Sequence, residues 1–517
     1  MKRGLSRLLA GLSAVVLVGA ITRGGSRADR REDLKTLPYG VGVDIPASER
    51  PVYGGTLRAE VGAPVSLLEP AAGSIDTSEA ELVSLTYETL VRIDGRGDVQ
   101  PLLAETWERD ATMRRWKFHL RAGVHFQDGT ALTPQSAVAA LINADEDWRV
   151  TPTSDGLQIE TPSAAPDFPA TLAERKYVLV RRSKEAAGGT GPFKIESWEA
   201  GKRAVFTANP DYWGGRPFLD SVEVQLGRAA RERMIDLQVG KADAVELPAE
   251  MARRASDEKV GIEVTPPVEL LALIFPDGRA AGAGQAASPS RAGGRTAESE
   301  ARLRQAISRS IDRAAIVNLV LQKEGEPAGG LLPQWISGTE FLFSSAADPA
   351  AARALVKKIS PAATLVLGYD SGDALEQAVA ERIAVNAREA GITVTSIAIS
   401  QAPLAPSSAA RAGKPKYDAR LVRVNLVSPL PRPALAGLLA ELSPVLGGAE
   451  SAPSETADAA EIYAREKAAL ETWRVVPIAH LPRVYGLGVR VRNWSISPGT
   501  AMNGLPLADV WLKREAQ

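Results

Sequence analysis

Cysteine is absent from the 517-residue sequence. Its absence excludes disulfide bonds, thiolate metal sites and cysteine nucleophiles. It also leads us to expect no lipid anchor of the kind that is attached to an N-terminal cysteine. Any catalytic or metal chemistry must therefore come from other side chains.

Histidine is nearly as scarce, with three residues, His119, His125 and His480. His119 lies on the polar face of a predicted strand, and a predicted turn separates it from His125. None of the three has a spacing to aspartate or glutamate that is typical of a metal site. We therefore expect no metal ligand and no metal cofactor.

An excess of either charge sign is also missing: 61 Lys and Arg face 62 Asp and Glu, for a net charge of −1. This balance gives no electrostatic reason to expect nucleic acid as a partner. Hydrophobic residues at 45% and charged residues at 24% are typical of a soluble globular protein. The length exceeds that of a single core, and at about 150 residues each it predicts about three domains.

Common catalytic motifs are absent as well. The sequence contains no P-loop, no dinucleotide-binding glycine motif, no G-x-S-x-G and no H-E-x-x-H. Carboxylates are plentiful, but general acid–base catalysis needs a second positioned group, and the pattern shows none. We expect no catalytic residue and no cofactor, and a hydrolase-like enzyme with scattered catalytic groups is the alternative.

The N-terminus has the pattern of an export signal. Three basic residues flank or precede an apolar run at residues 8–21. This predicts a signal peptide at residues 1–21, with cleavage after Ala20 or Ala28. An uncleaved anchor is the alternative, although the run is shorter than the roughly 20 residues that span a bilayer. Residues 22–50 are charged and contain Gly and Pro, which predicts a linker.

The stretch at residues 86–134 has the clearest local structure. Apolar and basic residues alternate at 116–121, the period of a strand with one buried face. The Asp-Gly pair at 128–129 predicts a turn, because Gly tolerates positive φ. Thr133 is placed to cap a helix whose first turn contains Pro134. A strand, a turn and a helix should therefore follow one another here.

Many residues of this stretch recur in a fixed order and spacing: Tyr87, Glu88, Leu90, Val91, Asp94, Gly97, Pro101, Leu103, Ala104, Glu105, Trp107, Phe118, Leu120, Arg121, Gly123, Val124, Phe126, Asp128, Gly129, Leu132 and Thr133. In this pattern the chain resembles the extracytoplasmic solute-binding proteins of family 5, the peptide-, opine- and nickel-binding receptors of ABC importers. The resemblance returns at residues 189–193 and 209–215, and covers roughly 52–517 with gaps.

The resemblance implies an α/β fold of periplasmic-binding-protein type II, in which two lobes with mixed sheets are joined by crossover strands and form three subdomains. We expect lobe I at residues 51–268, with an inserted subdomain at about 71–187. Lobe II should occupy 269–478, and the chain should return to lobe I at 479–517. The Ala-, Gly- and Ser-rich segment 279–297 is expected to be a flexible insertion.

Several elements are predicted from residue patterns alone. Residues 270–275 form an apolar run suited to a buried strand, and 193–197 an alternating strand. A buried strand at 364–369, a helix with one apolar face at 375–387 and a strand at 392–394 predict a parallel strand-helix-strand unit.

Three candidate ligand-binding residues come from the resemblance. Leu68 and Glu69 lie in a segment whose backbone borders the ligand in relatives. His480 lies near the expected crossover between the lobes, where a cleft forms.

The remaining candidates lie where the chain departs from its peptide-binding relatives. Arg423 and Val424 stand where these relatives have a Gly-Trp pair. Val427 takes the place of the Asp that holds a peptide's free amine in them. Val422, Val424 and Leu426 alternate as one apolar face of a strand, which leaves Arg423 and Asn425 on the other face. We expect that face to meet the cleft, with Arg423 holding a carboxylate or phosphate by two N–H bonds. The alternatives are a shifted alignment, with an acid such as Glu441 nearby, and an Arg423 that covers a helix on the outer side.

The predicted function is that of a monomeric periplasmic receptor. It would capture a peptide or other small solute between closing lobes and deliver it to the permease subunits of an ABC importer. Contact with the membrane would come only through the transporter. A receptor-like protein that kept the fold and lost transport is a further alternative.

Overall fold

The structure, a computed structural model, describes residues 50–65, 77–94, 96–142, 144–182, 187–276, 296–338, 343–359, 362–400, 417–446, 453–454, 456–496, 504 and 507–514. All of them belong to one unit, which comprises Pro46–Gln517. The predicted signal peptide, the linker up to residue 49 and the insertion up to residue 295 lie outside the described residues.

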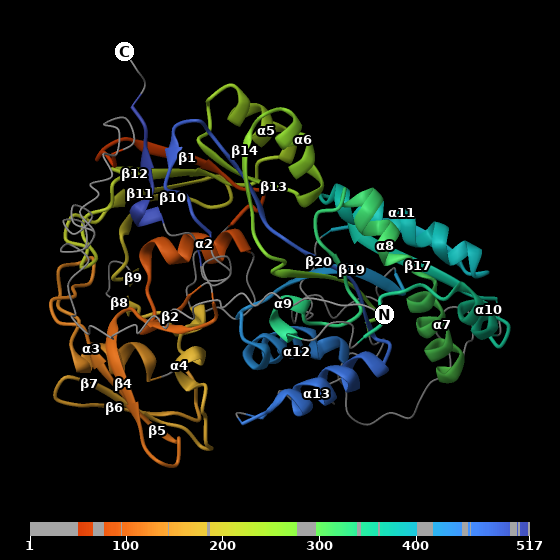
Figure 1. The fold of residues 1–517 in the computed structure, drawn as a ribbon, viewed down its shortest axis with the longest axis horizontal. Helices are drawn as coiled ribbons and strands as arrows, with labels where there is room; N and C mark the ends of the chain where they lie inside the picture. The colour runs from red at the N-terminus through yellow and green to blue at the C-terminus, as the bar shows by residue number, and fades with distance from the viewer. Residues whose placement is uncertain are drawn as a thin grey trace, which may run out of the picture. The chain divides into compact units, whose positions relative to one another are not determined.

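A mixed seven-stranded sheet combines strands from distant parts of the chain (Figure 1). Its strands in spatial order are β10 (Phe193–Glu199), β11 (Arg203–Ala208), β12 (Ser221–Gln225), β1 (Thr56–Glu60), β13 (Ala244–Leu247), β21 (Val484–Leu487) and β14 (Gly261–Val264). Strand β1 is parallel to both neighbours. Its helices and short turns are α2 (Thr77–Thr86), α5 (Ala230–Gln238), η4 (Ala249–Met251) and α6 (Ala252–Asp257). Leu82 and Leu85 of α2 pack into the core of this sheet.

A second mixed sheet has six strands. In spatial order they are β16 (Glu326–Pro327), β20 (Val475–Leu481), β15 (Glu269–Ile274), β19 (Ala419–Asn425), β17 (Thr364–Asp370) and β18 (Thr393–Ile399). Its helices are α7 (Ala297–Ser310), α8 (Arg313–Ala315), η5 (Ile316–Val320), α9 (Gln334–Ser337), α10 (Pro349–Val356), α11 (Ala374–Glu389), α12 (Pro431–Leu446) and α13 (Ala459–Glu471). Helices α7, α10 and α11 share one core, and α12 and α13 another, so the sheet is covered on both faces.

Both faces of β15 are therefore buried, which explains why residues 270–275 read as a continuous apolar run. The predicted strand-helix-strand unit is also confirmed. Strands β17 and β18 are parallel, and α11 between them buries its predicted apolar face. The turn after α11 is made by Gly391 at a φ of 87°, which glycine adopts without strain.

A four-stranded antiparallel sheet and two short hairpins form a third group. Its strands are β2 (Val91–Ile93), β3 (Val99–Pro101), β4 (Ala104–Arg109), β5 (Arg115–Leu120), β6 (Arg149–Pro152), β7 (Gly156–Glu160), β8 (Arg181–Arg182) and β9 (Ala187–Gly188). Its helices are α3 (Pro134–Leu141), α4 (Phe168–Thr171) and η3 (Arg175–Tyr177). A pair of strands, β22 (Val491–Arg492) and β23 (Trp511–Leu512), and the turn η7 (Leu507–Asp509) complete the described elements.

The local predictions for residues 86–134 are confirmed. Trp116 and Phe118 of β5 are buried, and Gly129 adopts a φ of 84°. The Thr133 side chain accepts a hydrogen bond from the Ser136 backbone N–H at 3.2 Å and caps α3.

The alternation predicted from Phe193 onward is wrong. Strand β10 has an irregular register between Ile195 and Ser197, and Ile195 is 37% exposed. Such a bulge places an extra residue in one strand, so the following side chains change face.

The chain passes twice between the seven-stranded and the six-stranded sheet, and the two passages lie side by side. One runs from β14 to β15, and the other from β20 to β21. The backbone N–H of Thr265 donates to the Arg483 carbonyl at 3.0 Å, and that of Val268 to the Leu481 carbonyl at 2.9 Å. The passages are thus bonded to each other as well as to their sheets.

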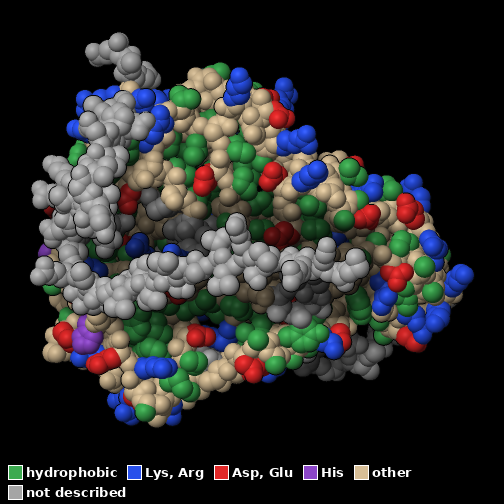
Figure 2. Space-filling view, viewed as in Figure 1, with side chains coloured by type: hydrophobic (Ala, Val, Ile, Leu, Met, Phe, Trp, Pro, Cys, Tyr) green, Lys and Arg blue, Asp and Glu red, His purple; other side chains and the backbone are tan. Residues whose placement is uncertain are grey.

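Figure 2 shows basic and acidic side chains interspersed over the described surface of one face, as the near-zero net charge predicts. In the described part of the chain, no helix combines the length and the apolar composition that crossing a membrane requires.

Candidate functional site

The last residues of β19 carry two predicted site residues, Arg423 and Asn425. Val422 and Val424 lie in the core with α12 and α13, so the predicted apolar face of this strand is confirmed. Arg423 and Asn425 lie on the other face and are half-buried. The candidates at residues 68 and 69, Leu68 and Glu69, lie outside the described residues.

Arg423 lies among carboxylates of the protein itself. Its Nη2 is 2.7 Å from Oδ2 of Asp373, and its Nη1 is 3.6 Å from Oε2 of Glu269. Glu376 and Glu250 are close enough to act on it electrostatically. Burial alone would lower the pKa of the Arg423 guanidinium, but these four carboxylates more than offset that effect and raise it.

This surrounding bears on the prediction made for Arg423. An anion at this position would face the carboxylates of Asp373 and Glu269, which are ion-paired with the guanidinium. Capture of a ligand's carboxylate or phosphate by Arg423 stays a prediction. Asp373 is also the N-cap of α11 and accepts from the Leu375 N–H at 2.9 Å. The alternative interpretation, in which Arg423 covers a helix, agrees with this contact. Contact of Asn425 with a solute stays a prediction.

Val427 packs against α12. A Cβ added to Gly437 would lie 2.5 Å from Cγ2 of Val427, so the glycine leaves the room that the valine fills. A valine offers a ligand's ammonium group no charge and no hydrogen-bond acceptor. Contact of Val427 with a solute is not tested by these contacts and stays a prediction.

His480 is enclosed in the six-stranded sheet. Its ring is 3% exposed, and Nε2 lies 3.0 Å from the carbonyl oxygen of Leu331. Burial lowers the pKa of this imidazole to about 4, so the ring is neutral at pH 7. In this arrangement the ring is buried against the segment at Leu331. Contact of His480 with a ligand stays a prediction.

The same segment is held from its other side by Glu466 of α13. One carboxylate oxygen accepts from the backbone N–H groups of Leu331 at 2.5 Å and Leu332 at 3.1 Å. Burial raises the pKa of Glu466 to about 7, although the two N–H donors lower it. Glu466 and His480 thus fix one loop through two buried titratable side chains.

Glu88 is the centre of a buried network that the sequence analysis did not single out. Its carboxylate accepts from the Thr190 hydroxyl at 2.8 Å, the Tyr212 hydroxyl at 2.7 Å and the Trp213 indole N–H at 2.8 Å. All four positions belong to the residues that carry the family resemblance. The sequence therefore contained the acid and its three donors, but only the distances in the structure show that they bind one another.

A second missed network joins α2 to a crossover. Nη1 of Arg483 is 3.3 Å from Oε1 of Glu81, and the Tyr485 hydroxyl donates to the same carboxylate. Burial raises the pKa of the Tyr485 hydroxyl well above its usual value, so this group stays a donor. No local pattern announces this contact, because Glu81 and Arg483 are far apart in the sequence.

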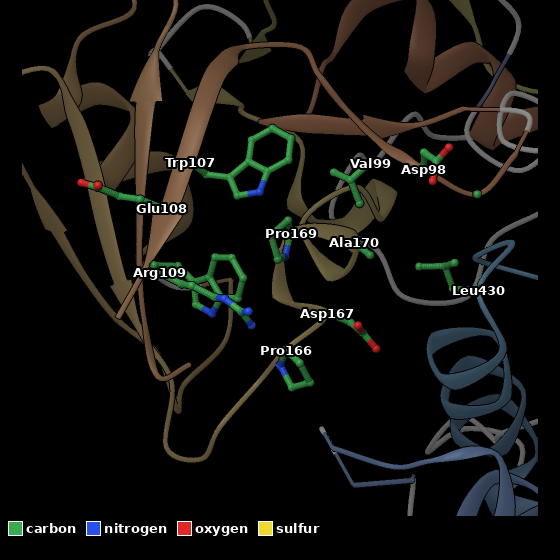
Figure 3. Close-up of a pocket in the computed structure, with 12 residues that line it drawn as sticks. Asp98, Val99, Trp107, Glu108, Arg109, Pro166, Asp167, Pro169, Ala170 and Leu430 are labelled. Carbon is green, nitrogen blue, oxygen red and sulfur yellow. The ribbon is translucent and has the colours of Figure 1, made fainter. Parts of the chain in front are cut away.

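A cavity of about 600 Å³ lies between the four-stranded sheet and the start of α12 (Figure 3). Its apolar walls include Val99, Trp107, Pro169 and Leu430, and Arg109 lies at one side. The volume is in the usual range for small-molecule pockets of roughly 300–1,000 Å³. Five separate stretches of the chain build it, so the sequence gives no local sign of it.

The start of α12 is tied to the helix α4 beside this cavity. Arg432 is only 6% exposed, and its Nε is 3.5 Å from Oδ2 of Asp167. Its Nη2 donates to the Thr171 hydroxyl at 3.2 Å. Leu430 approaches the turn between β2 and β3, where its Cδ2 would lie 3.5 Å from a Cβ added to Gly97. These contacts join parts of the chain that belong to different sheets.

Within the described ranges, no group of three or more histidine, aspartate or glutamate side chains is placed to hold a metal ion.

Comparison with protein families identifies the pattern behind the resemblance. A family model described as "Bacterial extracellular solute-binding proteins, family 5 Middle" matches residues 98–441. The chain is 24% identical over 310 residues to the probable D,D-dipeptide-binding periplasmic protein DdpA of Escherichia coli K12, and the alignment covers 52% of this chain and 56% of that protein. The chain thus spans little more than half the length of that relative.

Solved structures show the same fold. NikA from Staphylococcus aureus in complex with Ni(L-His)2 superposes with a TM-score of 0.73 at 16% identity, over 88% of this chain and 99% of that one. AgaA from Agrobacterium tumefaciens R10 in complex with agropinic acid has a TM-score of 0.71 at 21% identity, over 89% and 99%. The predicted fold class, α/β with mixed sheets and two lobes, is thereby confirmed.

Proposed function

Because the chain belongs to the bacterial extracellular solute-binding proteins of family 5, we propose that it is the solute receptor of an ABC importer. It would bind a peptide or another small solute outside the cytoplasm and present it to the permease subunits. The proposal follows the functions of its relatives, which include a probable D,D-dipeptide-binding protein and a nickel-binding protein.

One observation carries this proposal: the paired passages of the chain between the two large sheets. Because both passages run together through residues 265–268 and 481–484, rotation about a small number of backbone bonds can move one sheet relative to the other. Ligand binding between the lobes would then favour one arrangement by its differential affinity. A receptor that reports occupancy to a permease requires such a change.

The lobe limits inferred from the sequence stay part of the proposal, with lobe I at residues 51–268 and 479–517 and lobe II at 269–478. The inserted subdomain then corresponds to the group built around the four-stranded sheet. Export through cleavage after Ala20 or Ala28, a periplasmic location and a monomeric state are also proposed, as is the absence of an enzymatic activity.

We further propose that a free α-amine does not select the solute. By the resemblance, Val427 takes the place of the Asp that holds a free amine in peptide-binding relatives, and it packs on Gly437. A thermal-shift panel of free and N-acetylated peptides tests this. Stabilisation by free peptides that acetylation abolishes would contradict the proposal.

The receptor function is tested by uptake and by bound solute. Protein purified from its native periplasm is denatured, released small molecules are identified by mass spectrometry, and their uptake is measured in cells lacking the gene. We expect a released solute, loss of its uptake without the protein, and a protein that leaves the solute chemically unchanged. Turnover of the solute would favour the enzyme alternative, and binding without loss of uptake would favour a receptor that lost transport.

A further inference from the structure

Two hydrogen-bond donors at the cavity beside α12 have no partner in the described part of the protein. The Trp107 indole N–H points into the cavity (Figure 3) and donates to no described residue, while its ring packs against Phe118 with centroids 6.4 Å apart. The Arg109 guanidinium makes no ion pair with a described carboxylate, and its contact is with the Trp116 ring, 5.9 Å from the centroid.

The carboxylate between these two residues does not neutralise Arg109. Glu108 alternates to the other face of β4, where its Oε1 lies 3.9 Å from Lys117 Nζ and 3.7 Å from His119 Nε2. Trp107 and Arg109 therefore share one face of the strand, with two residues of an extended strand spanning roughly 6.6 Å. Both donors therefore belong to the same side of the cavity.

The rest of the cavity is suited to a flat apolar group. Val99, Pro169 and Leu430 line it together with the Trp107 ring. Flat aromatic and proline surfaces favour a ring that packs face to face or edge to face. Asp98 and Asp167 also line the cavity, and Oδ2 of Asp167 lies 3.5 Å from Nε of Arg432. In Figure 3, Asp98 lies across the cavity from Arg109, so a solute's anionic group is favoured at Arg109 and disfavoured at the two aspartates.

We propose that this cavity is a binding subsite for a small solute that joins a planar ring to a carboxylate. The carboxylate accepts from the Trp107 N–H and the Arg109 guanidinium, which can bind it through two parallel N–H bonds. The ring lies against Trp107, Pro169 and Leu430. This inference rests on the proposed receptor function and names the class of solute that the receptor takes.

The subsite also depends on how α12 lies relative to α4. Leu430 closes one wall, and Arg432 two residues later holds α4 through Asp167 and Thr171. The cavity is complete only while α12 lies against α4. A solute bound there favours this arrangement because its contacts are lost when Leu430 moves away.

Isothermal titration of the full-length mature protein with phenylacetate tests the proposal. Phenylacetamide is the neutral control of the same shape, and phenethylamine is the cationic one. The variants are Arg109→Gln, which removes the charge, and Trp107→Phe, which keeps a ring and removes the N–H. Arg253→Gln is the matched control, because Arg253 is an exposed arginine outside the cavity.

We expect phenylacetate to bind the parent protein, and phenylacetamide and phenethylamine to bind at least about tenfold more weakly. Arg109→Gln should weaken phenylacetate binding by about tenfold or more, since hydrogen bonds to charged groups contribute that much. Trp107→Phe should weaken it several-fold, and Arg253→Gln should leave it unchanged. Thermal unfolding of each variant shows whether it is folded. If Trp107→Phe does not fold, Arg109→Gln alone decides the test, because Arg109 is exposed and its replacement should not disturb the fold.

Equal binding of phenylacetate and phenylacetamide, equal affinity in parent and Arg109→Gln, or no binding of phenylacetate at millimolar concentration would overturn the subsite. The receptor function is judged separately by uptake of the solute released from native protein. If that uptake requires the protein but the solute's affinity is unchanged in Arg109→Gln and Trp107→Phe, the receptor stands and the subsite fails. If uptake does not require the protein, the receptor function fails whatever phenylacetate does.

Discussion

Glu88, which is buried, and Arg423, which is half-buried, are both charged side chains, but their surroundings are opposite. Glu88 has three neutral donors, Thr190, Tyr212 and Trp213, on one carboxylate. Arg423 is one cation among four carboxylates. The first network is built from residues that match the family pattern, and the second contains a residue that departs from it.

The difference distinguishes residues that maintain the fold from residues that could select the solute. The Glu88 network connects the end of α2 to the segments around Thr190 and Tyr212, so the family pattern there maintains the fold. At Arg423 the departure from the family pattern is paired with carboxylates of β15 and of the start of α11. The cavity beside Trp107 is therefore a second place to look for the chemistry that selects the solute.

The contrast between the Glu88 and Arg423 networks would not hold if Glu88 contributed little to the free energy of unfolding. Glu88→Ala leaves three buried donors without their acceptor, and we expect the free energy of unfolding to fall by about 3–4 kcal/mol. Glu88→Gln keeps one acceptor oxygen and should cost less. Urea unfolding measures both. Glu105→Ala, which removes a half-exposed carboxylate 3.2 Å from Arg121, is the control and should cost under about 1 kcal/mol.

Arg423→Met tests the second network. It leaves Glu269, Asp373 and Glu376 without their cation, and we expect a loss of about 2 kcal/mol at pH 8, reduced because Arg423 is 29% exposed. Burial already raises the pKa of Glu376 to about 7, and loss of the arginine raises it further.

A carboxyl whose folded pKa is raised contributes stability at low pH that is lost as pH rises through that pKa. The deficit of Arg423→Met should therefore be larger at pH 8 than at pH 5 in urea unfolding. A deficit that does not change with pH would contradict the network. The affinity for the native solute is measured in parallel, and its loss would support Arg423 as a ligand contact.

Glu466 sharpens the comparison, because it is a buried carboxyl held by two backbone N–H groups. Its pKa of about 7 lies above the ordinary 4.5. Its contribution is fully present below about pH 4.5 and is lost as pH rises through 7. Glu466→Gln keeps the carbonyl acceptor for Leu331 and Leu332, and should be more stable than the parent by about 1–2 kcal/mol at pH 8 and nearly equal at pH 5. Parallel pH profiles of parent and variant would contradict this.

The smallest effect is expected for the contact between α12 and α4. Arg432→Met removes the link to Asp167 and Thr171, and should raise the population in which α12 has moved away by about fivefold, or about 1 kcal/mol. Because the chain has no cysteine, spin labels can be attached at Glu146→Cys and Lys467→Cys without interfering thiols. They report the distance between residue 146, which precedes β6, and residue 467 of α13, which packs on α12. Asp167→Asn should act in the same direction, and Arg253→Gln should have no effect. Identical distance distributions in all variants would show that the contact does not hold α12.

Much of the fold was predictable because its signals are local. The buried strand at residues 270–275, the apolar face of α11 and the cap at Thr133 are each recorded within a few neighbouring residues. The alternation of Val422 and Val424 also correctly placed Arg423 on the opposite face. What lies against that face depends on packing, which no period of the strand records.

The site was less predictable for the same reason. The donors of Glu88 lie more than a hundred residues away in the sequence, and the cavity takes walls from five separate stretches of the chain. His480 shows the same limit. The resemblance implies its position near the crossover, but the orientation of the ring, toward the Leu331 carbonyl, is set by the neighbouring strands.

Strand β14 has consequences for the order in which the protein folds. In the seven-stranded sheet its neighbour is β21, and Val264 pairs with Val484. While the protein folds, β14 therefore lacks its neighbour until residues 484–487 have joined the sheet. Pairing over such a separation is slow, because the loop must close before the contacts are gained. Completion of this sheet thus depends on one of the last strands of the chain, and until then the edge of β13 is open to other chains.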